Sequence, residues 1–368
     1  MASTVLKPLG FALNQPLFTG ALLYLLTKGP PELRDRLLEP LRNNLANNGA
    51  ATIARLIKVL KFLTAIGIVR RIHRALNSLA YNNWKLGRAG APFKFGPQKE
   101  EMVVITGGSS GFGYEMVKAF SKVARVVVLD VAAFPPELGS LPDVHFYQCD
   151  VTNTPLVEGI CSDIKRTHGE ATVLINNAGI ANGKTVLETT NEQTERLMKV
   201  NLLCHFVLIR EFLPGMLKRN KGHIVSVASM ASFVAAPGLV DYCVSKVGAL
   251  YLNDGIRAEC MSRYPGGEGI CTTSVHPSWH ATGIIKGSEK LLEKYGVKPD
   301  PPNKVSDAIL EQVLKGKSGR LIVPTTEARK AMLRSWPLWL QDILIGNASS
   351  KKKKKRTFEF GREENSAL

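Results

Sequence analysis

The sequence predicts an α/β fold, in which one doubly wound parallel sheet is flanked by an N-terminal helical arm and a C-terminal helical appendage. A β-branched strand at Met102–Thr106 leads into a glycine-rich turn and then a helical pattern, the order typical of parallel sheets. Further short strands are indicated at Arg125–Leu129, His223–Ala228 and Arg320–Val323. Apolar segments with helical periodicity lie before and after this region.

The charge of the chain is concentrated at its two ends. Residues 1–100 hold 15 Lys and Arg against 4 Asp and Glu, and residues 351–368 hold 7 against 3. The 250 residues between them hold 26 against 24, although the whole chain carries +17. The central region therefore needs no polyanionic partner. Because apolar segments adjoin the basic ends, we expect them to meet an anionic membrane and no nucleic acid.

The N-terminal arm contains two apolar segments. Residues 8–27 carry no charge, but polar residues and a proline at 14–16 interrupt the run of about 20 apolar residues that a spanning helix needs. Residues 50–80 place apolar side chains such as Leu60 opposite cations such as Lys61. A basic amphipathic helix of this kind lies in the headgroup plane of a membrane. We expect embedding over spanning; packing of both segments on the central domain or a twin subunit is the alternative.

Glycines and prolines at 84–100 predict the linker between the arm and the central domain. The apolar residues 336–344 include two tryptophans, which suits a membrane interface, a cap over a cleft or a partner contact. The lysine run at 351–356 is expected to be solvated, with lipid attraction as the next choice. The expected domains are 1–95 (helical membrane-associated arm and linker), 96–325 (α/β domain) and 326–368 (apolar helix and basic tail).

Six cysteines lie in apolar or helix-like surroundings without a Cys-x-x-Cys pair, which predicts reduced thiols and no thiol chemistry. His276 and His280 are four residues apart, but Pro277 between them argues against a helix and no third ligand is evident. We therefore expect no metal site.

The glycine-rich turn has the features of a dinucleotide site. Gly107, Gly111 and Gly113 permit a tight turn, let backbone amides approach a pyrophosphate and let the next helix pack close to the strand. Asp130 ends the second strand, where a carboxylate hydrogen-bonds an adenosine ribose and repels a 2′-phosphate. This favours NAD(H), and NADP(H) is possible because cations such as Arg125 are near in sequence.

A serine, a tyrosine and a lysine form the candidate catalytic group. Ser229 stands at the end of a strand, and Tyr242 and Lys246 are four residues apart, so both lie on one face of a helix. A free tyrosine has a pKa of about 10, but a neighbouring ammonium and a positive nicotinamide ring favour the phenolate. Ser229 would then hydrogen-bond a substrate oxygen while Tyr242 exchanges its proton.

The spacing Thr-Gly-x-x-x-Gly-x-Gly at 106–113 resembles the classical short-chain dehydrogenase/reductase family, which implies a Rossmann-like fold. Residues 176–179 are similar to its Asn-Asn-Ala-Gly motif, and 277–282 to its Pro-Gly-x-Val-x-Thr segment, from which Ser278 and His280 depart. The resemblance covers 101–283. It implies the catalytic residues Ser229, Tyr242, Lys246 and Asn201. It implies cofactor contacts from Gly107, Ser109, Ser110, Gly111, Phe112, Gly113, Asp130, Asp150, Val151, Asn177, Ala178, Gly179, Tyr242, Lys246, Pro277, His280 and Thr282.

Within that family, residues 233–242 resemble the retinol dehydrogenase and 17-beta-hydroxysteroid dehydrogenase branch. The resemblance implies an NAD(P)-dependent oxidoreductase of lipid metabolism, acting on a retinoid-, steroid- or lipid-like alcohol, ketone or aldehyde. It implies a homodimer on the endoplasmic reticulum or a lipid droplet, with the catalytic domain facing the cytosol. Residues 284–302 are the expected substrate loop, lined by Ile284, Ile285, Leu291 and Leu292. The alternatives are an NADPH-dependent reductase of a lipid ketone, such as a keto-sphingoid base, and a non-catalytic membrane or lipid-droplet binding protein.

Overall fold

The computed structural model describes residues 15–43, 49–285, 292–293 and 296–343. Its contacts divide the chain into two compact units, residues 1–86 and 87–368. The expected substrate-loop residue Leu291, the apolar residue Leu344 and the lysine run at 351–356 lie outside the described residues.

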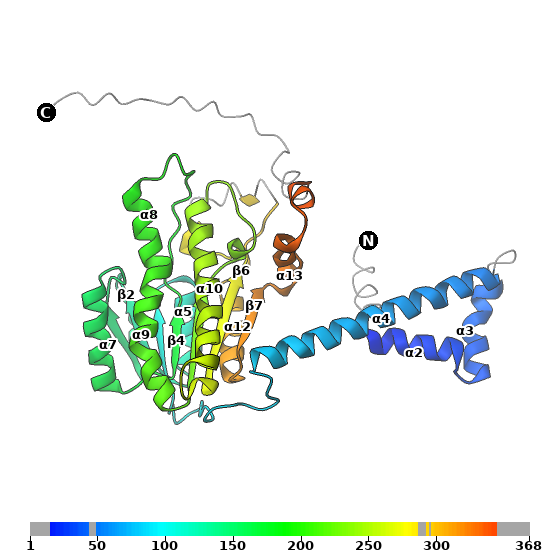
Figure 1. Ribbon diagram of the computed structural model, residues 1–368, viewed down its shortest axis with the longest axis horizontal. Coiled ribbons are helices and arrows are strands. Elements are labelled where there is room, and N and C mark those ends of the chain that lie inside the picture. Colours follow the sequence, from blue (N-terminus) through cyan, green and yellow to red (C-terminus); the bar gives the residue numbers. More distant parts are fainter. Residues whose placement is uncertain (1–14, 44–48, 286–291, 294–295, 344–368) are drawn as a thin grey trace. The chain divides into compact units, whose positions relative to one another are not determined.

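A seven-stranded parallel sheet forms the centre of the second unit (Figure 1). Its spatial order is β3-β2-β1-β4-β5-β6-β7. The chain thus winds outward from β1 to β3, returns to the other side of β1 at β4 and continues outward, so the sheet is doubly wound as expected. The strands are β1 (Met102–Thr106), β2 (Arg125–Asp130), β3 (Val144–Gln148), β4 (Val173–Asn176), β5 (Gly222–Val227), β6 (Ile270–Pro277) and β7 (Gly319–Val323).

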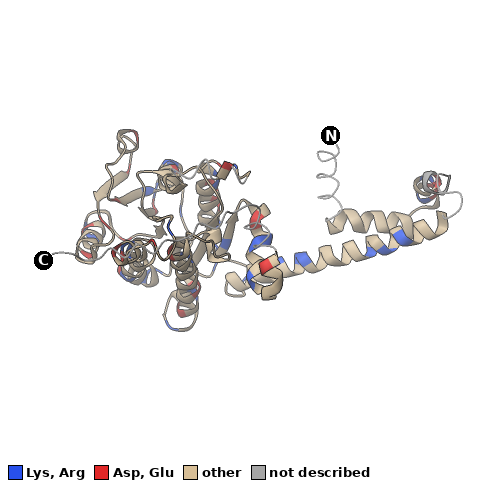
Figure 2. Cartoon of the chain, turned by 90° about the horizontal axis from the view of Figure 1, so that it is seen from above, with Lys and Arg blue, Asp and Glu red and all other residues tan. Residues whose placement is uncertain are grey.

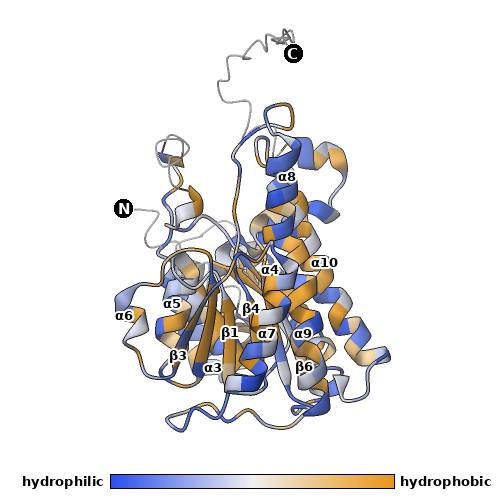
Figure 3. Cartoon of the chain, turned by 90° about the vertical axis from the view of Figure 1, so that its left-hand side faces the viewer, coloured by the Kyte–Doolittle hydropathy of each residue, from blue (hydrophilic) through white to orange (hydrophobic). Residues whose placement is uncertain are grey.

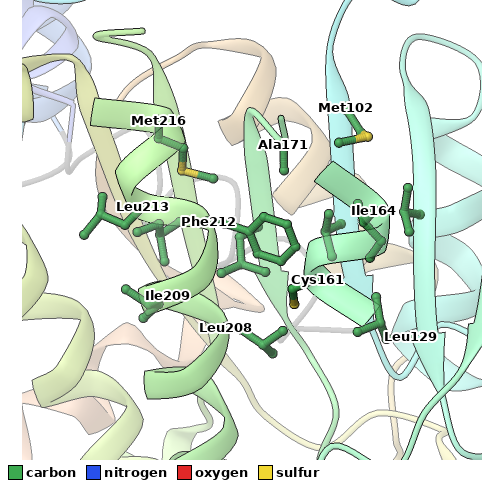
Figure 4. Close-up of a cluster of buried hydrophobic side chains, with 14 of the residues drawn as sticks. Met102, Leu129, Cys161, Ile164, Ala171, Leu208, Ile209, Phe212, Leu213 and Met216 are labelled. Carbon is green, nitrogen blue, oxygen red and sulfur yellow. The ribbon is translucent and has the colours of Figure 1, made fainter. Parts of the chain in front are cut away.

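Helices cover both faces of this sheet, which explains why the central strands are almost continuously apolar (Figure 3). Alternate residues of each strand enter opposite cores. Figure 4 shows part of the first core, in which Phe212 and Leu208 of one helix and Ile164 of another belong to the same apolar cluster. That core lies under α7 (Thr154–His168), α9 (Cys204–Lys218) and α10 (Val240–Ser262), and the second lies under α5 (Gly111–Phe120) and α12 (Asn303–Leu314).

The connections complete the unit. A π-helical turn joins α8 to α9 in one continuous helical segment. Residues 338–343 are helical, and Leu338 and Trp339 there are exposed. The connecting elements are α6 (Pro136–Gly139), α8 (Asn191–Met198), the π turn (Lys199–Leu203), α13 (Ala328–Ala331) and the 3₁₀ turns Met230–Ser232, Gly267–Gly269, Gly283–Ile285, Thr325–Glu327 and Met332–Ser335.

Arg88 fixes the start of this unit to the amino-terminal edge of the sheet. Its guanidinium donates to the carbonyl oxygens of Ala91 (2.8 Å), Gly269 (3.2 Å) and Gly316 (3.1 Å). It also lies 3.9 Å from the centre of the Phe93 ring. Because a half-buried Arg with these partners anchors backbone directly, residues from 87 onward belong to the second unit.

The first unit is a helical hairpin of α2 (Pro16–Thr27) and α4 (Gly49–Tyr81), with α3 (Pro31–Asn43) between them (Figure 1). Gly67 leaves room for Pro16, and the Thr64 hydroxyl donates to that of Thr19 at 3.0 Å. At the other end Leu60 packs in an apolar cluster with residues of α2 and α3. The apolar face of residues 53–60, which the sequence assigns to a membrane, therefore forms the interior of the hairpin.

Large apolar side chains remain on the outside of the hairpin. Leu17, Phe18 and Tyr24 of α2 are half or more exposed, as are Phe62 and Val69 of α4. Figure 2 shows the Lys and Arg residues along the same long helix α4. The outer surface thus combines apolar side chains with cations.

Within the described ranges, one helical segment is long and apolar enough to cross a membrane, residues 191–218, and 44% of its most apolar window is buried. It packs on the sheet through α9, so its apolar character is accounted for by the core. Helix α2 is apolar but shorter.

Candidate active site

The glycine-rich turn joins β1 to α5 at the carboxyl edge of the sheet. Gly107 and Gly111 have φ angles of +69° and +55°, which favour glycine. A Cβ on Gly113 would lie 1.9 Å from the carbonyl oxygen of Gly107, so no side chain fits there. Ser110 caps α5 without a side-chain hydrogen bond. The first N–H groups of the helix are therefore left for an anion, as a dinucleotide turn requires.

Hydrogen bonds join this turn to the segment after β4. The Thr106 hydroxyl accepts from the N–H groups of Asn177 (3.0 Å) and Ala178 (3.1 Å). The Asn177 amide donates to the carbonyl oxygens of Thr106 and Gly107, both at 2.9 Å. Strands β1 and β4 are where the winding direction of the sheet reverses, which is the usual ligand position in such folds.

Asp130 ends β2 beside the turn and is 9% exposed. Its carboxylate accepts from the N–H groups of Ser109 (2.8 Å) and Ala132 (3.0 Å). Arg125 lies at the opposite end of β2 and donates to the carbonyl oxygen of His168 at 2.8 Å. That guanidinium is therefore directed away from the carboxylate at the other end of the strand.

Asp150 and Val151 follow β3 on the same edge of the sheet. The Asp150 carboxylate accepts from the N–H of Thr152 at 2.9 Å. Val151 packs in a small apolar cluster with Val200 and, at its margin, Ala178. The structure thus brings the residues after β1, β3 and β4 to one region.

The serine, tyrosine and lysine come from two adjoining elements. Ser229 follows β5, and its Oγ accepts from the N–H of Ala231 at 3.1 Å. Tyr242 and Lys246 lie one turn apart at the start of α10, with the ammonium 5.5 Å from the centre of the phenol ring. Lys246 is 2% exposed and donates to the carbonyl oxygen of Val227 at 2.9 Å.

Burial governs the ionisation of this group. It raises the pKa of Tyr242 to about 12, and the adjacent Ser229 hydroxyl opposes that rise. Burial also lowers the pKa of Lys246 to about 8, because the ammonium loses its hydration. In the protein by itself, the phenol is therefore protonated at neutral pH.

Asn201 occupies the π turn between α8 and α9, an irregularity common at functional sites. Its amide accepts from the N–H of Ile180 (2.8 Å) and donates to the Ile180 carbonyl (2.9 Å) and the Ser245 hydroxyl (3.0 Å). A Cβ on Gly179 would lie 3.3 Å from the Lys246 ammonium nitrogen. Asn201 and Gly179 therefore border the lysine, while the Asn201 side chain holds the loop after β4.

The segment after Pro277 lies over the glycine-rich turn. His280 is 2% exposed, and its ring meets that of Phe112 edge to face at 5.4 Å. The Thr282 side chain would contact a Cβ built on Gly111 at 3.5 Å. The two ends of the expected cofactor site, from β1 and from β6, are thus adjacent.

Several residues that hold the site were not identified from the sequence. Ser245 binds Asn201, and the Ser232 hydroxyl donates to the Lys246 carbonyl at 2.8 Å. His276 Nδ1 lies 3.0 Å from the carbonyl oxygen of Ser229. The sequence indicates such residues only as polar side chains at core positions of a helix or strand. That pattern does not identify their hydrogen-bond partners.

All six cysteines are free and buried. Burial raises the pKa of Cys243, which adjoins Tyr242 in sequence. It also raises the pKa of Cys204, to about 12. These thiols are therefore protonated. No group of three or more His, Cys, Asp or Glu side chains in the described part of the chain is placed to hold a metal ion.

Residues 101–290 match the family model described as short chain dehydrogenase. The chain is 38% identical over 168 residues to dehydrogenase RED2 of Cochliobolus heterostrophus, covering 45% of this chain and 63% of that protein, less than two thirds of its length. It is 32% identical over 226 residues to mouse epidermal retinol dehydrogenase 2, covering 58% and 72%.

The fold is similar to that of a solved 4-hydroxyisoleucine dehydrogenase mutant complexed with NADH and succinate. The TM-score is 0.56, with 21% identity over 60% of this chain and 96% of that one. At this identity the likeness concerns the arrangement of the sheet and its helices.

Proposed function

Since this chain belongs to the short-chain dehydrogenase family, we propose that it transfers a hydride between a nicotinamide dinucleotide and a lipophilic alcohol or carbonyl compound at a membrane surface. The observation that carries this proposal is the group of Ser229, Tyr242 and Lys246 beside the glycine-rich turn. Hydroxyl, phenol and ammonium there have the chemistry that proton transfer to or from a carbonyl oxygen requires.

The residues of the turn fit a nicotinamide dinucleotide. The positive φ angles of Gly107 and Gly111 and the close approach of Gly113 to Gly107 form the tight turn that a pyrophosphate site needs, and the buried Ser109 hydroxyl has no protein partner. Gly107, Ser109, Ser110, Gly111, Phe112 and Gly113 would hold the pyrophosphate, Asp130 the adenosine ribose, Asp150 and Val151 the adenine, and Asn177, Ala178, Gly179, Pro277, His280 and Thr282 the nicotinamide half. The bound dinucleotide supplies or accepts the hydride.

The protein's own groups would manage the proton. In carbonyl reduction, Ser229 donates a hydrogen bond to the substrate oxygen, and Tyr242 gives its proton to that oxygen as it becomes an alkoxide. The Lys246 ammonium stabilises the phenolate that remains. In alcohol oxidation the phenolate takes the proton back, so both directions use the same residues. Asn201 positions the loop beside the lysine, from which water would resupply the proton.

We propose NAD(H) as the preferred dinucleotide. The Asp130 carboxylate lies beside the turn, where a 2′-phosphate would meet a negative charge, and the Arg125 guanidinium is occupied at the far end of β2. This arrangement supports the dehydrogenase assignment over an NADPH-dependent reductase of a lipid ketone.

The outer surface of the helical hairpin supports membrane attachment. Leu17, Phe18 and Phe62 are exposed, although the hairpin also has an apolar interior around Leu60. Several large apolar side chains on one outer surface mark an interaction or membrane site. The nearby cations suit anionic headgroups, and the proposed location is the cytosolic face of the endoplasmic reticulum or a lipid droplet.

We also propose a homodimer. Phe206 of α9 and Val244 and Tyr251 of α10 are about half or more exposed, on helices whose other faces pack on the sheet. An apolar surface of this kind suits a subunit contact. A monomeric mass in analytical ultracentrifugation would contradict this assignment.

The conversion of Tyr242 to Phe should lower turnover by about 10²- to 10⁴-fold, because it removes the proton carrier but little volume. Steady-state oxidation and reduction of a panel of retinoids, steroids and long-chain alcohols or ketones would measure this. Binding of NADH, followed by fluorescence, should be unchanged. Tyr251→Phe on the same helix is the matched control, and retained turnover in Tyr242→Phe would rule out the mechanism.

NADH should bind about tenfold or more tightly than NADPH, because the Asp130 carboxylate favours ribose hydroxyls and repels a phosphate. Fluorescence titration with each dinucleotide measures the ratio. Asp130→Ser should bring the affinities for NADH and NADPH closer together. Tighter binding of NADPH to the natural protein would show that the cofactor preference is reversed.

Carbonyl reduction should depend on the ionisation of Lys246. With a pKa lowered to about 8, the lysine is charged below that pH and neutral above it, whereas Tyr242 stays protonated up to about 12. We expect kcat/KM to be constant below about pH 7 and to fall above about pH 8. Lys246→Met should be slow and lack this break. A wild-type profile without a break between about pH 7 and pH 9 argues against a role for the ammonium.

Leu17→Asp combined with Phe62→Asp should reduce binding to phosphatidylcholine–phosphatidylserine vesicles by about tenfold or more. Each large apolar side chain that leaves water contributes about 1.5–3 kcal/mol. Vesicle sedimentation of the full chain measures the partition. Leu314→Asp, an exposed position on α12, is the control for added charge. Equal partition of the double variant and the control would place the anchor elsewhere.

A further inference from the structure

The imidazole of His276 is fully buried next to Ser229, yet the proposed chemistry does not use it. It belongs to β6, which pairs in parallel with β5, the strand that leads to the serine. A buried polar ring needs a reason to be there, because an apolar side chain would pack at lower cost.

The partners of the ring define its protonation state. Nδ1 lies 3.0 Å from the carbonyl oxygen of Ser229, and since a carbonyl only accepts, Nδ1 carries the proton. Nε2 lies 3.1 Å from the Ser274 hydroxyl, which then donates to it. Burial lowers the pKa of His276 to about 4, with smaller contributions from the charges of Arg320 and Lys246, while the hydrogen bond to Ser229 opposes this shift. The ring is therefore neutral at physiological pH and has one fixed donor.

Two hydrogen-bond donors hold the carbonyl oxygen of Ser229. It accepts from the N–H of Ser232 at 2.9 Å as well as from His276. The imidazole also lies 4.6 Å from the ring of Phe233, the residue that closes the turn. Rotation of the peptide after Ser229 would break the hydrogen bond between its carbonyl and the His276 imidazole. The direction of the serine side chain therefore depends on this hydrogen bond.

We propose that His276 is a positioning residue, whose Nδ1–H fixes the Ser229 backbone so that the hydroxyl points at the substrate oxygen. The Ser229 carbonyl fixes the tautomer of the ring, the Ser274 hydroxyl donates to Nε2 and holds the ring in place, and the Phe233 ring packs against it. This inference rests on the proposed function, because it assigns a task to the serine. His276 itself touches no reacting atom.

The test compares His276→Phe with His276→Asn in the full chain. Phe keeps the ring volume without a donor, and a misplaced serine should lower kcat by about 10- to 100-fold. The Asn amide nitrogen can occupy the position of Nδ1 and donate to the same carbonyl, so kcat should recover to within about fivefold of the natural protein. NADH affinity should be unchanged in both variants.

His223 provides the matched control. It is a fully buried histidine on the neighbouring strand, where it bonds the Thr273 hydroxyl at 2.8 Å. His223→Phe should lower the unfolding temperature as His276→Phe does, with kcat of the folded protein unchanged. Equal kcat losses in the two Phe variants would overturn the inference, because the effect would then be structural.

A double-mutant cycle with Ser229→Ala separates positioning from stability. Once the hydroxyl is gone, adding His276→Phe should cost nothing more in kcat. Additive losses would contradict the proposal. If His276→Phe does not fold, Ser274→Ala serves in its place, with a several-fold loss of kcat expected only when Ser229 is present. Absence of turnover in the natural protein, or turnover that survives Tyr242→Phe, would refute the proposed function itself.

Discussion

The ammonium group of Lys246 sits inside the protein, and its neighbours are arranged around that charge. The Val227 carbonyl accepts a hydrogen bond from the ammonium, and the Ser232 hydroxyl donates one to the lysine's own carbonyl. Gly179 lacks a side chain where one would approach the nitrogen at 3.3 Å. A buried cation is costly unless it has such partners, so these segments form one mutually dependent group.

Much of the fold and many of the site residues could be predicted, because parallel strands all end at one edge of a sheet. A glycine turn after β1, an Asn-Asn-Ala-Gly segment after β4 and a serine after β5 are local features of the sequence, and the topology alone makes them adjacent. The NAD(H) preference rests on equally local information, the position of Asp130 at a strand end. The assignments of individual site residues remain predictions.

The contacts that support the site could not be predicted, because they join residues that are far apart in the sequence. Ser245 meets Asn201 across 44 residues, and His276 meets Ser229 across 47. No periodic pattern or fixed motif spacing in the sequence indicates either contact. The N-terminal arm shows a related difficulty: periodicity locates α4 correctly, but it does not reveal that α2 covers the face around Leu60. A pattern of apolar residues indicates a buried face and leaves its partner undefined.

The six buried cysteines give the protein a built-in reporter of conformational opening. All six are 7% exposed or less, and they come from α7, α9, α10, β6 and the end of β3. An alkylating reagent needs an exposed thiolate, so each thiol reacts only when its own segment opens. The labelling rates of individual cysteines would therefore rank local unfolding free energies across the sheet and its helices without any added probe.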